Sequence, residues 1–365
     1  MEKISDIISA IEAYAPLHLQ EGYDNCGLQV GDGNAEATGV LLCVDVTEAV
    51  VDEAIALGAN MVVSHHPLIF RGLKKLVGRS DIERIVIKAI KNDIAIDSAH
   101  TNMDNGRGGV SARMAQKLGM KNVRVLVPQV GRQVKVVVYV PTSYADAVAD
   151  AMHACGAGNI GDYEHCSYRI AGEGRYRAKA GAHPFVGTPG EMHSEPETRI
   201  EVIADAAVKD RVVQAMLQAH PYEEPAYDVL QLQNESPYEG AGVVGDIEPT
   251  SATDFFAKLK NVFGVDAVRF CGDATKTIRR VALCGGSGAE FIGAAVHSGA
   301  DIYVTGDVKY HDFTGNASRI LIADIGHYES EQFTKDIFYE IIREKMPNFA
   351  TYYAKSENKQ VKFFI

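Results

Sequence analysis

Apolar runs of strand length alternate with amphipathic helical segments in both outer parts of the chain, which constrains the fold more than any other feature. In the first part we expect strands at 39–47, 60–67 and 94–101, with helices at 48–59, 81–93 and 108–120. In the last part we expect strands at 278–286, 301–307 and 319–327, with helices at 288–300 and 328–345. Such alternation predicts two α/β halves that form one layered core of mainly parallel sheets covered by helices.

The middle of the chain has a different pattern. Strands at 133–141, 197–206 and 226–233 alternate with helices at 143–158 and 208–220, while 171–195 is Gly-rich and has little periodicity. A strand-helix-strand unit occurring twice predicts an inserted α+β domain of the ferredoxin-like type at 128–245. The core is then built from 1–127 and 246–365, because 365 residues exceed what one hydrophobic core usually supports.

Composition excludes several classes of protein. With 36 basic and 48 acidic side chains, the chain carries a net charge of −12, which disfavours binding to nucleic-acid phosphates. The six cysteines are scattered without CxxC spacing, as is usual in a reducing compartment. Charged residues interrupt the first helical segment, so neither a signal peptide nor a membrane span is expected. These features predict a cytoplasmic protein without membrane association.

Metal-type ligands follow the expected strands, where open α/β sheets place their sites. The run Ser64-His65-His66-Pro67 ends one strand. Adjacent residues on a strand point to opposite faces, but a chain that leaves the strand at Pro67 can direct its two imidazoles toward two neighbouring ions. A pair of half-exposed histidines hydrogen-bonded in a loop explains the dipeptide better when it is taken alone.

Two further strand ends add ligands. His100 and Asp104 follow the strand at 94–101, and His327 and Glu331 stand at a strand-to-helix junction. Residues four apart on a helix lie one turn from each other on the same face, which is a suitable separation for sharing an ion. The alternatives are a solvated turn aspartate and a carboxylate that merely favours the helix N-terminus.

Together, three histidines and two carboxylates predict a metal site better than any one motif does. Mixed nitrogen and oxygen ligation suits Zn, Mn, Fe, Co or Ni, and the lack of a thiolate argues against a closed structural zinc site. The number of ligands favours two ions. The expected ligands are His65, His66, Asp104, His327 and Glu331.

Three other motifs remain open. The segment from Thr305 to His311 could bind a phosphate or a polar substrate or move protons, or it could be an Asp-capped turn. The segment from His220 to Pro225 could be a second polar site or a structured loop. The glycines at 285–288 suit tight strand-to-helix packing better than anion binding. Several other histidines, including His153 and His165, have no partner that the sequence identifies.

Five segments, 24–31, 64–70, 100–104, 305–311 and 326–331, resemble the signatures of the NIF-three (NGG-interacting factor three) family, in this order. Members of that family are commonly labelled GTP cyclohydrolase 1 type 2 homologues. Gly156-Ala157-Gly158, Cys166 and the run from His220 to Asp228 resemble the central insert of its longer members. The segment 174–178 departs from the pattern because it lacks an expected proline.

The resemblance implies a toroidal homohexamer with two divalent metal ions per subunit facing an inner cavity. It implies the same five ligands, and Glu331 is the expected bridge because a carboxylate can span two ions while an imidazole cannot. The expected activity is hydrolysis by metal-activated water, acting on a nucleotide, as a cyclohydrolase, or on a phosphoester. His311 or His100 would shuttle the proton, and Lys309 and Asp307 would bind the substrate.

Two other functions compete with a hydrolase. In a metal-stabilised scaffold or regulatory protein, the ions would hold the two halves together and the insert would bind a small effector or a partner. A toroidal DNA clamp is disfavoured by the net negative charge.

Overall fold

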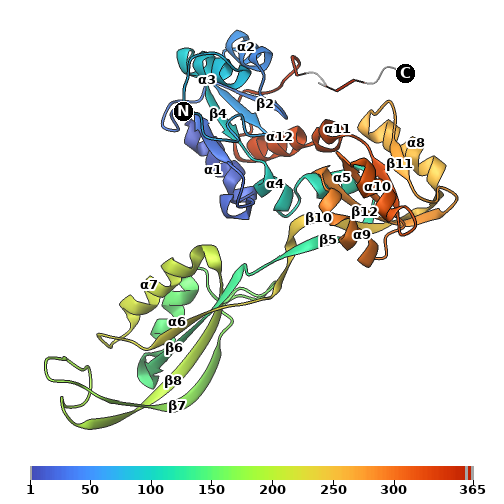
Figure 1. The fold of residues 1–365 in the computed structure, drawn as a ribbon. Helices are drawn as coiled ribbons and strands as arrows, with labels where there is room; N and C mark the ends of the chain where they lie inside the picture. The colour runs from blue at the N-terminus through green and yellow to red at the C-terminus, as the bar shows by residue number, and fades with distance from the viewer. Residues whose placement is uncertain (1, 358–360, 363–365) are drawn as a thin grey trace. The chain divides into compact units, whose positions relative to one another are not determined.

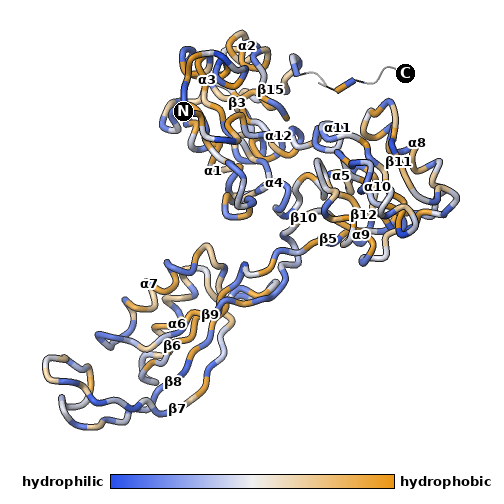
Figure 2. Tube along the Cα trace, in the orientation of Figure 1, coloured by the Kyte–Doolittle hydropathy of each residue, from blue (hydrophilic) through white to orange (hydrophobic). Residues whose placement is uncertain are grey.

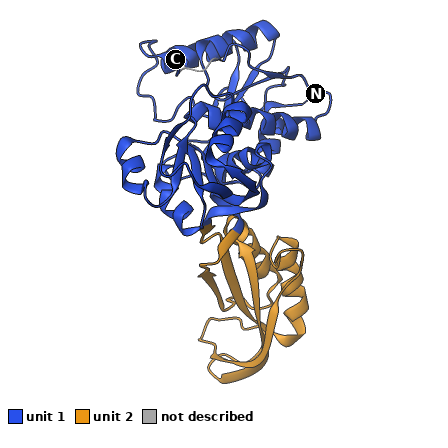
Figure 3. Ribbon diagram, turned by 90° about the vertical axis from the view of Figure 1, so that its right-hand side faces the viewer, with its two compact units in different colours: residues 1–128, 237–365 blue, residues 129–236 orange. Residues whose placement is uncertain are grey.

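Two sheets organise the outer parts of the chain and a third organises the middle (Figure 1). The computed structural model describes residues 2–357 and 361–362. It divides into two units, shown in Figure 3: unit 1 comprises 1–128 and 237–365, and unit 2 comprises 129–236. The sequence analysis placed the end of the insert at 245. The division lies earlier, inside the long strand β10 (Glu235–Ser251), which continues from unit 2 into unit 1.

The first sheet of unit 1 has the strand order β1-β4-β3-β2-β15. Its members are β1 (Gly27–Val30), β2 (Val40–Cys43), β3 (Met61–Ser64), β4 (Ala95–Ser98) and β15 (Thr351–Tyr353). All neighbours are parallel except β1 and β4. Every residue of β2, β3 and β4 is buried, because helices cover both faces of this sheet.

Alternate residues of these strands enter two separate cores. Val40, Leu42 and Met61 pack with α1 (Ile4–Tyr14) and α12 (Thr334–Lys345) on one face. Leu41 and Val62 pack with α2 (Glu48–Leu57) and α3 (Asp81–Lys91) on the other face. Figure 2 shows these strands as apolar segments. Because side chains alternate along a strand, one short apolar run serves both cores.

The second sheet of unit 1 has the strand order β11-β14-β13-β12-β10-β5. Its further members are β5 (Lys121–Val130), β11 (Arg269–Cys271), β12 (Thr277–Ser287), β13 (Ile302–Gly306) and β14 (Leu321–Asp324). β12, β13 and β14 are parallel. One face packs against α5 (Val110–Lys117) and α8 (Ala252–Phe263), the other against α9 (Ile292–His297) and α10 (Tyr310–Asn316).

Two helices cross between the halves of unit 1. α5 comes from the first half of the chain, and its Met114 lies in the core of the second sheet. α12 comes from the end of the chain, and its Phe338 lies in the core of the first sheet. Arg113 on α5 pairs with Glu340 on α12, which joins the two helices directly. The two halves are therefore interlocked and not merely adjacent.

Unit 2 has the connectivity of a split β-α-β module. Its sheet has the order β7-β8-β6-β9, with antiparallel neighbours throughout. Its elements are β6 (Gln133–Pro141), α6 (Ala145–Ala154), β7 (Tyr168–Arg177), β8 (Met192–Asp205), α7 (Lys209–Ala219) and β9 (Tyr227–Gln231). One core holds α6 and α7 against the sheet.

The predicted α/β class is confirmed, but several elements differ. The single helix expected at 328–345 is two helices, α11 (His327–Glu331) and α12, because the side chains of Gln332 and Thr334 bond the carbonyls of Glu329 and Glu331. The strands β1, β11 and β15 were not predicted; β11 and β15 have only three residues each, too few to show a periodic pattern. Parts of 171–195 form β7 and β8, and β7 is mostly exposed and so gave no apolar alternation.

Among the described residues, no helix combines the length and apolar character that crossing a bilayer requires.

Replacing Phe338 with alanine tests the interlocking of the halves. Phe338 is fully buried against the first sheet, so Phe338→Ala should lower the free energy of unfolding by about 3–5 kcal/mol. Urea denaturation measures this change. Leu76→Ala is the control, because Leu76 is 46% exposed and should cost less than about 0.5 kcal/mol. Equal costs for the two variants would contradict the packing described.

Candidate metal centre

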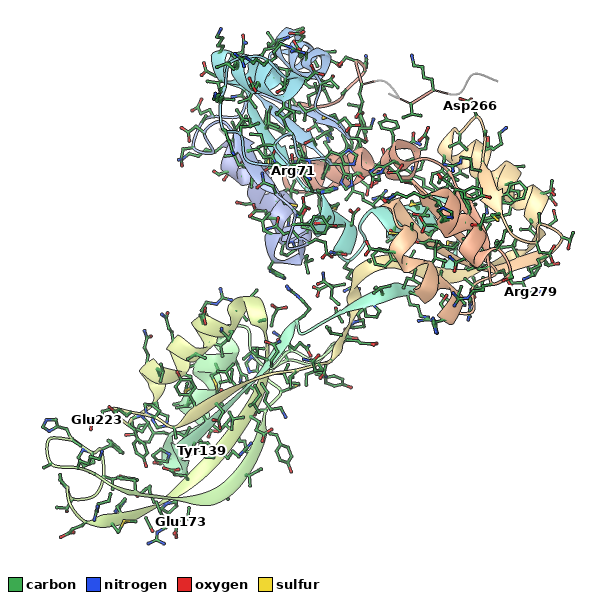
Figure 4. All side chains as sticks on the ribbon, in the orientation of Figure 1. Arg71, Tyr139, Glu173, Glu223, Asp266 and Arg279 are labelled. Carbon is green, nitrogen blue, oxygen red and sulfur yellow. The ribbon has the colours of Figure 1, made fainter. Side chains whose placement is uncertain are left out.

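Three strand ends in unit 1 bring the expected ligands together. His65 and His66 follow β3, and Asp104 lies on the short helix α4 (Thr101–Asn105) after β4. His327 and Glu331 are the first and last residues of α11, which follows β14. Figure 4 draws the side chains around α11 and α12. The site is therefore assembled from both halves of unit 1.

Two groups of potential ligands share one carboxylate. His65, Asp104 and Glu331 form the first group, and His66, His327 and Glu331 form the second. Glu331 Oε1 lies 3.6 Å from His65 Nε2, whereas Glu331 Oε2 lies 2.9 Å from His66 Nε2 and 3.1 Å from His327 Nε2. Each carboxylate oxygen thus faces a different group, which is the arrangement of a bridging ligand.

The separations within the groups suit coordination. Ligand atoms at about 2.0–2.1 Å from a tetrahedral zinc ion are roughly 3.3 Å apart. His65 Nε2 lies 3.7 Å from Asp104 Oδ1, and His66 Nε2 lies 3.3 Å from His327 Nε2. His65 Nε2 and Asp104 Oδ1 are buried, and neither has a hydrogen-bond partner within the described part of the chain. Buried polar atoms without partners are costly, so these two atoms fit a metal ion.

Each imidazole is oriented through its other nitrogen. His65 Nδ1 donates to the carbonyl of Ala99 at 2.9 Å, and His66 Nδ1 donates to Asp45 Oδ1 at 2.8 Å. His327 Nδ1 donates to Asp307 Oδ2 at 2.7 Å. These bonds leave every Nε2 directed into the cluster, as is usual for metal-binding histidines.

The carboxylates raise the proton affinity of the imidazoles. Burial would lower the pKa of His66, but hydrogen bonds to Asp45 and Glu331 raise it to about 10. Burial acts likewise on His327, and Glu331 and Asp307 raise its pKa to about 9. Burial also disfavours ionised Glu331, yet the surrounding histidines hold its pKa well below its usual value. In the metal-free protein, protonated His66 and His327 therefore balance the negative charge of Glu331.

Glycine at 286 makes room for the shared carboxylate. A Cβ atom there would lie 2.1 Å from Glu331 Oε1, and the residue has a φ of +63°. The Gly286 amide also donates to Ser330 Oγ at 2.9 Å. The glycine run at 285–288 therefore serves close packing against α11.

A cavity of about 960 Å³ adjoins the cluster. Its wall includes Asp45, His66, Asp307 and His327, together with two arginines, Arg84 and Arg269. This volume is within the range of small-molecule sites. The second group of ligands thus faces a space large enough for a nucleotide.

The remaining predicted residues have different positions. His100 lies with the cluster, since its ring nitrogens belong to a group with those of His65 and His66. Asp307, predicted to bind substrate, lines the cavity and also accepts the hydrogen bond from His327. His311 and Lys309 are exposed at the start of α10, and neither is among the described residues that line the cavity.

Sequence analysis missed two supporting carboxylates. Asp45 follows β2 at the same sheet edge as His65, and Glu357 accepts from its backbone amide at 2.8 Å. Asp24 accepts from His100 Nδ1 at 2.9 Å. The rule that sites lie at the carboxyl ends of parallel strands could have identified Asp45. No spacing rule connects Asp24 with His100.

Comparison with known proteins gives a consistent result. The family model of Duf34/NIF3 (NGG1p interacting factor 3) matches residues 2–360. A relative from Halalkalibacterium halodurans, named GTP cyclohydrolase 1 type 2 homolog, is 41% identical over 307 residues, covering 84% of this chain and 82% of its own. A Bacillus subtilis protein of the same name is 36% identical over 335 residues, covering 90% and 89%.

Solved structures agree with this comparison. A Bacillus cereus protein related to NIF3 superposes with a TM-score of 0.83 at 38% identity, covering 100% of this chain and 99% of its own. The Staphylococcus aureus protein SA1388 superposes with a TM-score of 0.82 at 30% identity, with the same coverage.

Metal binding should release protons. The raised pKa values of His66 and His327 stabilise the metal-free protein fully below the ordinary value of 6.5, and this contribution is lost as the pH rises through about 9 to 10. At pH 7, zinc must therefore displace the protons of His66 and His327, and its affinity should rise with pH. Calorimetry in buffers of different ionisation enthalpy counts these protons. A count of zero would contradict the assigned ligands.

Gly286→Ala should displace Glu331 and lower zinc affinity by at least about 10-fold, because the added methyl group occupies the position of the carboxylate. Gly264→Ala is the matched control, since Gly264 has a φ of +62° but no heavy atom within 4 Å of an added Cβ. It should cost about 1 kcal/mol of stability and leave zinc binding unchanged. Equal zinc affinity in the two variants would exclude the proposed role of Gly286.

Proposed function

Because this chain belongs to the Duf34/NIF3 family, we propose that it binds two divalent metal ions and uses them to hydrolyse a nucleotide or another phosphoester. The proposed ligands are His65, His66, Asp104, His327 and Glu331. The metal is one of Zn, Mn, Fe, Co and Ni, which accept mixed nitrogen and oxygen ligands.

One observation carries this proposal: two separate ligand groups share Glu331. A single structural ion would need only one closed group of ligands. Each group here supplies three protein ligands, which leaves a coordination position open in a tetrahedral site, as in catalytic zinc sites.

Two bound divalent ions would lower the pKa of a water molecule and polarise a substrate oxygen. The chain's own residues prepare the site for that chemistry. Asp45 and Asp307 fix the tautomers of His66 and His327, so that both Nε2 atoms stay available. The carboxylate of Glu331 keeps the two groups at a constant separation.

His100 is the proposed proton acceptor. Its Nδ1 donates to Asp24, which leaves Nε2 free to take a proton. Burial disfavours ionised Asp24, but hydrogen bonds from His100 and Thr101 lower its pKa, so it stays charged beside His100. His100 is 17% exposed and lies beside the ligand rings, with its ring centroid 5.2 Å from that of His65. His311 is the weaker candidate for proton acceptor, because its side chain is exposed on α10.

The cavity beside the second group supplies the proposed substrate site. Arg84 and Arg269 line it and can bind phosphate oxygens, in place of the Lys309 expected from sequence. Arg269 is held by Asp324 and by the carbonyl of Val308. The names of the relatives favour a purine nucleotide as substrate, with a cyclohydrolase reaction. A cytoplasmic location and assembly into a homohexameric toroid, both expected from sequence, are part of the same proposal.

A metal-stabilised scaffold is the second candidate. The ligands come from both halves of unit 1, so bound ions would join these halves, as a scaffold function requires. Chelation distinguishes the two functions. An enzyme should lose turnover and remain assembled, whereas a scaffold should lose thermal stability first.

A screen of the metal-loaded protein against nucleotides and phosphoesters should identify a substrate. With that substrate, His100→Asn should lower kcat by about 10²- to 10⁴-fold and retain the bound metal, because it removes a proton acceptor and no proposed ligand. His311→Ala is the control and should leave kcat unchanged. Loss of turnover in His311→Ala but not in His100→Asn would reverse the assignment. No turnover of any substrate, with stability lost on chelation, would favour the scaffold.

A further inference from the structure

One histidine of unit 2 has a buried side chain. His153 lies near the end of α6 and is 8% exposed. Neither of its ring nitrogens has a hydrogen-bond partner among the described residues. A neutral imidazole carries one donor and one acceptor, and burying both without partners is unfavourable. The ring is therefore positioned for a ligand that the protein atoms do not provide.

Two further ligand-type side chains surround this ring. His165 stacks on His153 with ring centroids 4.8 Å apart and an interplanar angle of 27°. Asp150 lies one helical turn before His153 on α6, where residues three apart share a face. One ligand atom from each of the three lies within 4.8 Å of the others. Asp150 and His165 are exposed, so their side chains can rotate toward the ring of His153.

The loop that carries His165 is held by backbone hydrogen bonds to β8 and within the loop itself. The Gly158 amide donates to the carbonyl of Ile203 on β8 at 2.7 Å, and the Cys166 amide donates to the carbonyl of Gly158 at 2.8 Å. Ile160 and Tyr163 exchange two backbone hydrogen bonds within the loop. The hydrogen bond between Cys166 and Gly158 joins the two ends of the loop 158–166.

Two unusual backbone features fix the approach of this loop to His153. A Cβ atom at Gly158 would lie 2.9 Å from Cδ2 of His153, so glycine is needed for the loop to pass this close. His165 has a φ of +56°, a left-handed conformation that is uncommon outside glycine. Such conformations cluster at ligand sites, where the surrounding structure maintains them.

From this geometry we propose that Asp150, His153 and His165 form a third metal site, which binds a divalent transition-metal ion such as zinc. Two imidazoles and one carboxylate are a ligand set of catalytic zinc sites, and they leave one position open for water or an exogenous ligand. The site lies wholly within unit 2 and shares no residue with the proposed dinuclear centre. It does not depend on the proposed hydrolase function.

The local charge is compatible with a cation. Asp150 supplies a negative charge to the site. Arg169 is a further basic group that acts on His153, and it pairs with Asp146 at 2.5 Å. The repulsion that Arg169 would exert on an ion is therefore partly offset.

Equilibrium dialysis of the full-length protein against micromolar zinc, followed by metal analysis, tests this site. His165→Ala and Asp150→Asn change exposed side chains, so the fold should be retained, as circular dichroism will check. His165→Ala should bind about one zinc ion fewer per chain than the wild type. His183→Ala is the matched control, since His183 is an exposed histidine of the same unit, and it should bind as much zinc as the wild type. Equal zinc content in His165→Ala and wild type would overturn the proposal.

The same comparison in a Glu331→Gln background separates this site from the dinuclear centre. If the ion belongs to unit 2, His165→Ala should still remove about one zinc ion per chain when the centre in unit 1 is disabled. If the difference disappears in that background, the lost ion belonged to unit 1 and the third site is wrong. Failure of Glu331→Gln itself to lower zinc content would count against the dinuclear centre and not against this site.

Discussion

A buried carboxylate facing three imidazoles is the interaction on which the functional part of this structure depends. Glu331 is 2% exposed, and an isolated carboxylate at such a depth would be strongly unfavourable. His65, His66 and His327 all lie within 3.6 Å of its oxygens, so positive charge is required around it. Protons can supply that charge in the metal-free protein, and divalent ions would supply it in the proposed centre. The raised pKa values of His66 and His327 follow from this requirement.

Glu331 meets the three histidines only when the two halves of unit 1 pack against each other. The first half contributes the ligands after β3 and on α4, and the second half contributes those on α11. α5 and α12 each cross to the core of the opposite sheet, and the pairing of Arg113 with Glu340 joins them. Residues separated by more than 200 positions therefore reach the same point only in the folded protein. Metal binding at the proposed dinuclear site would therefore require both halves of unit 1 to be folded and packed together.

Sequence predicted the parts of this arrangement that depend on local rules. Buried parallel strands have continuous apolar runs, and ligands at their carboxyl ends follow a general property of such sheets, so the α/β class and the five proposed ligands could be named. Two of the supporting residues could not. Asp24 and Glu357 act through the folded chain on His100 and Asp45, and no spacing connects them. The break between α11 and α12 depends on side-chain bonds to carbonyls, which helical periodicity does not reveal.

In unit 2, His153 and His165 had no partner in sequence because a closed loop brings them together.

The central claim is that Glu331 bridges two ions, and anomalous X-ray diffraction from crystals of the zinc-loaded protein tests it most directly. The account predicts two anomalous peaks in unit 1, about 3.5–4 Å apart, with one oxygen of Glu331 coordinating each. The first ion should contact His65 and Asp104, and the second His66 and His327. A single peak in unit 1, or two peaks of which either lies beyond coordination distance of Glu331, would contradict the account.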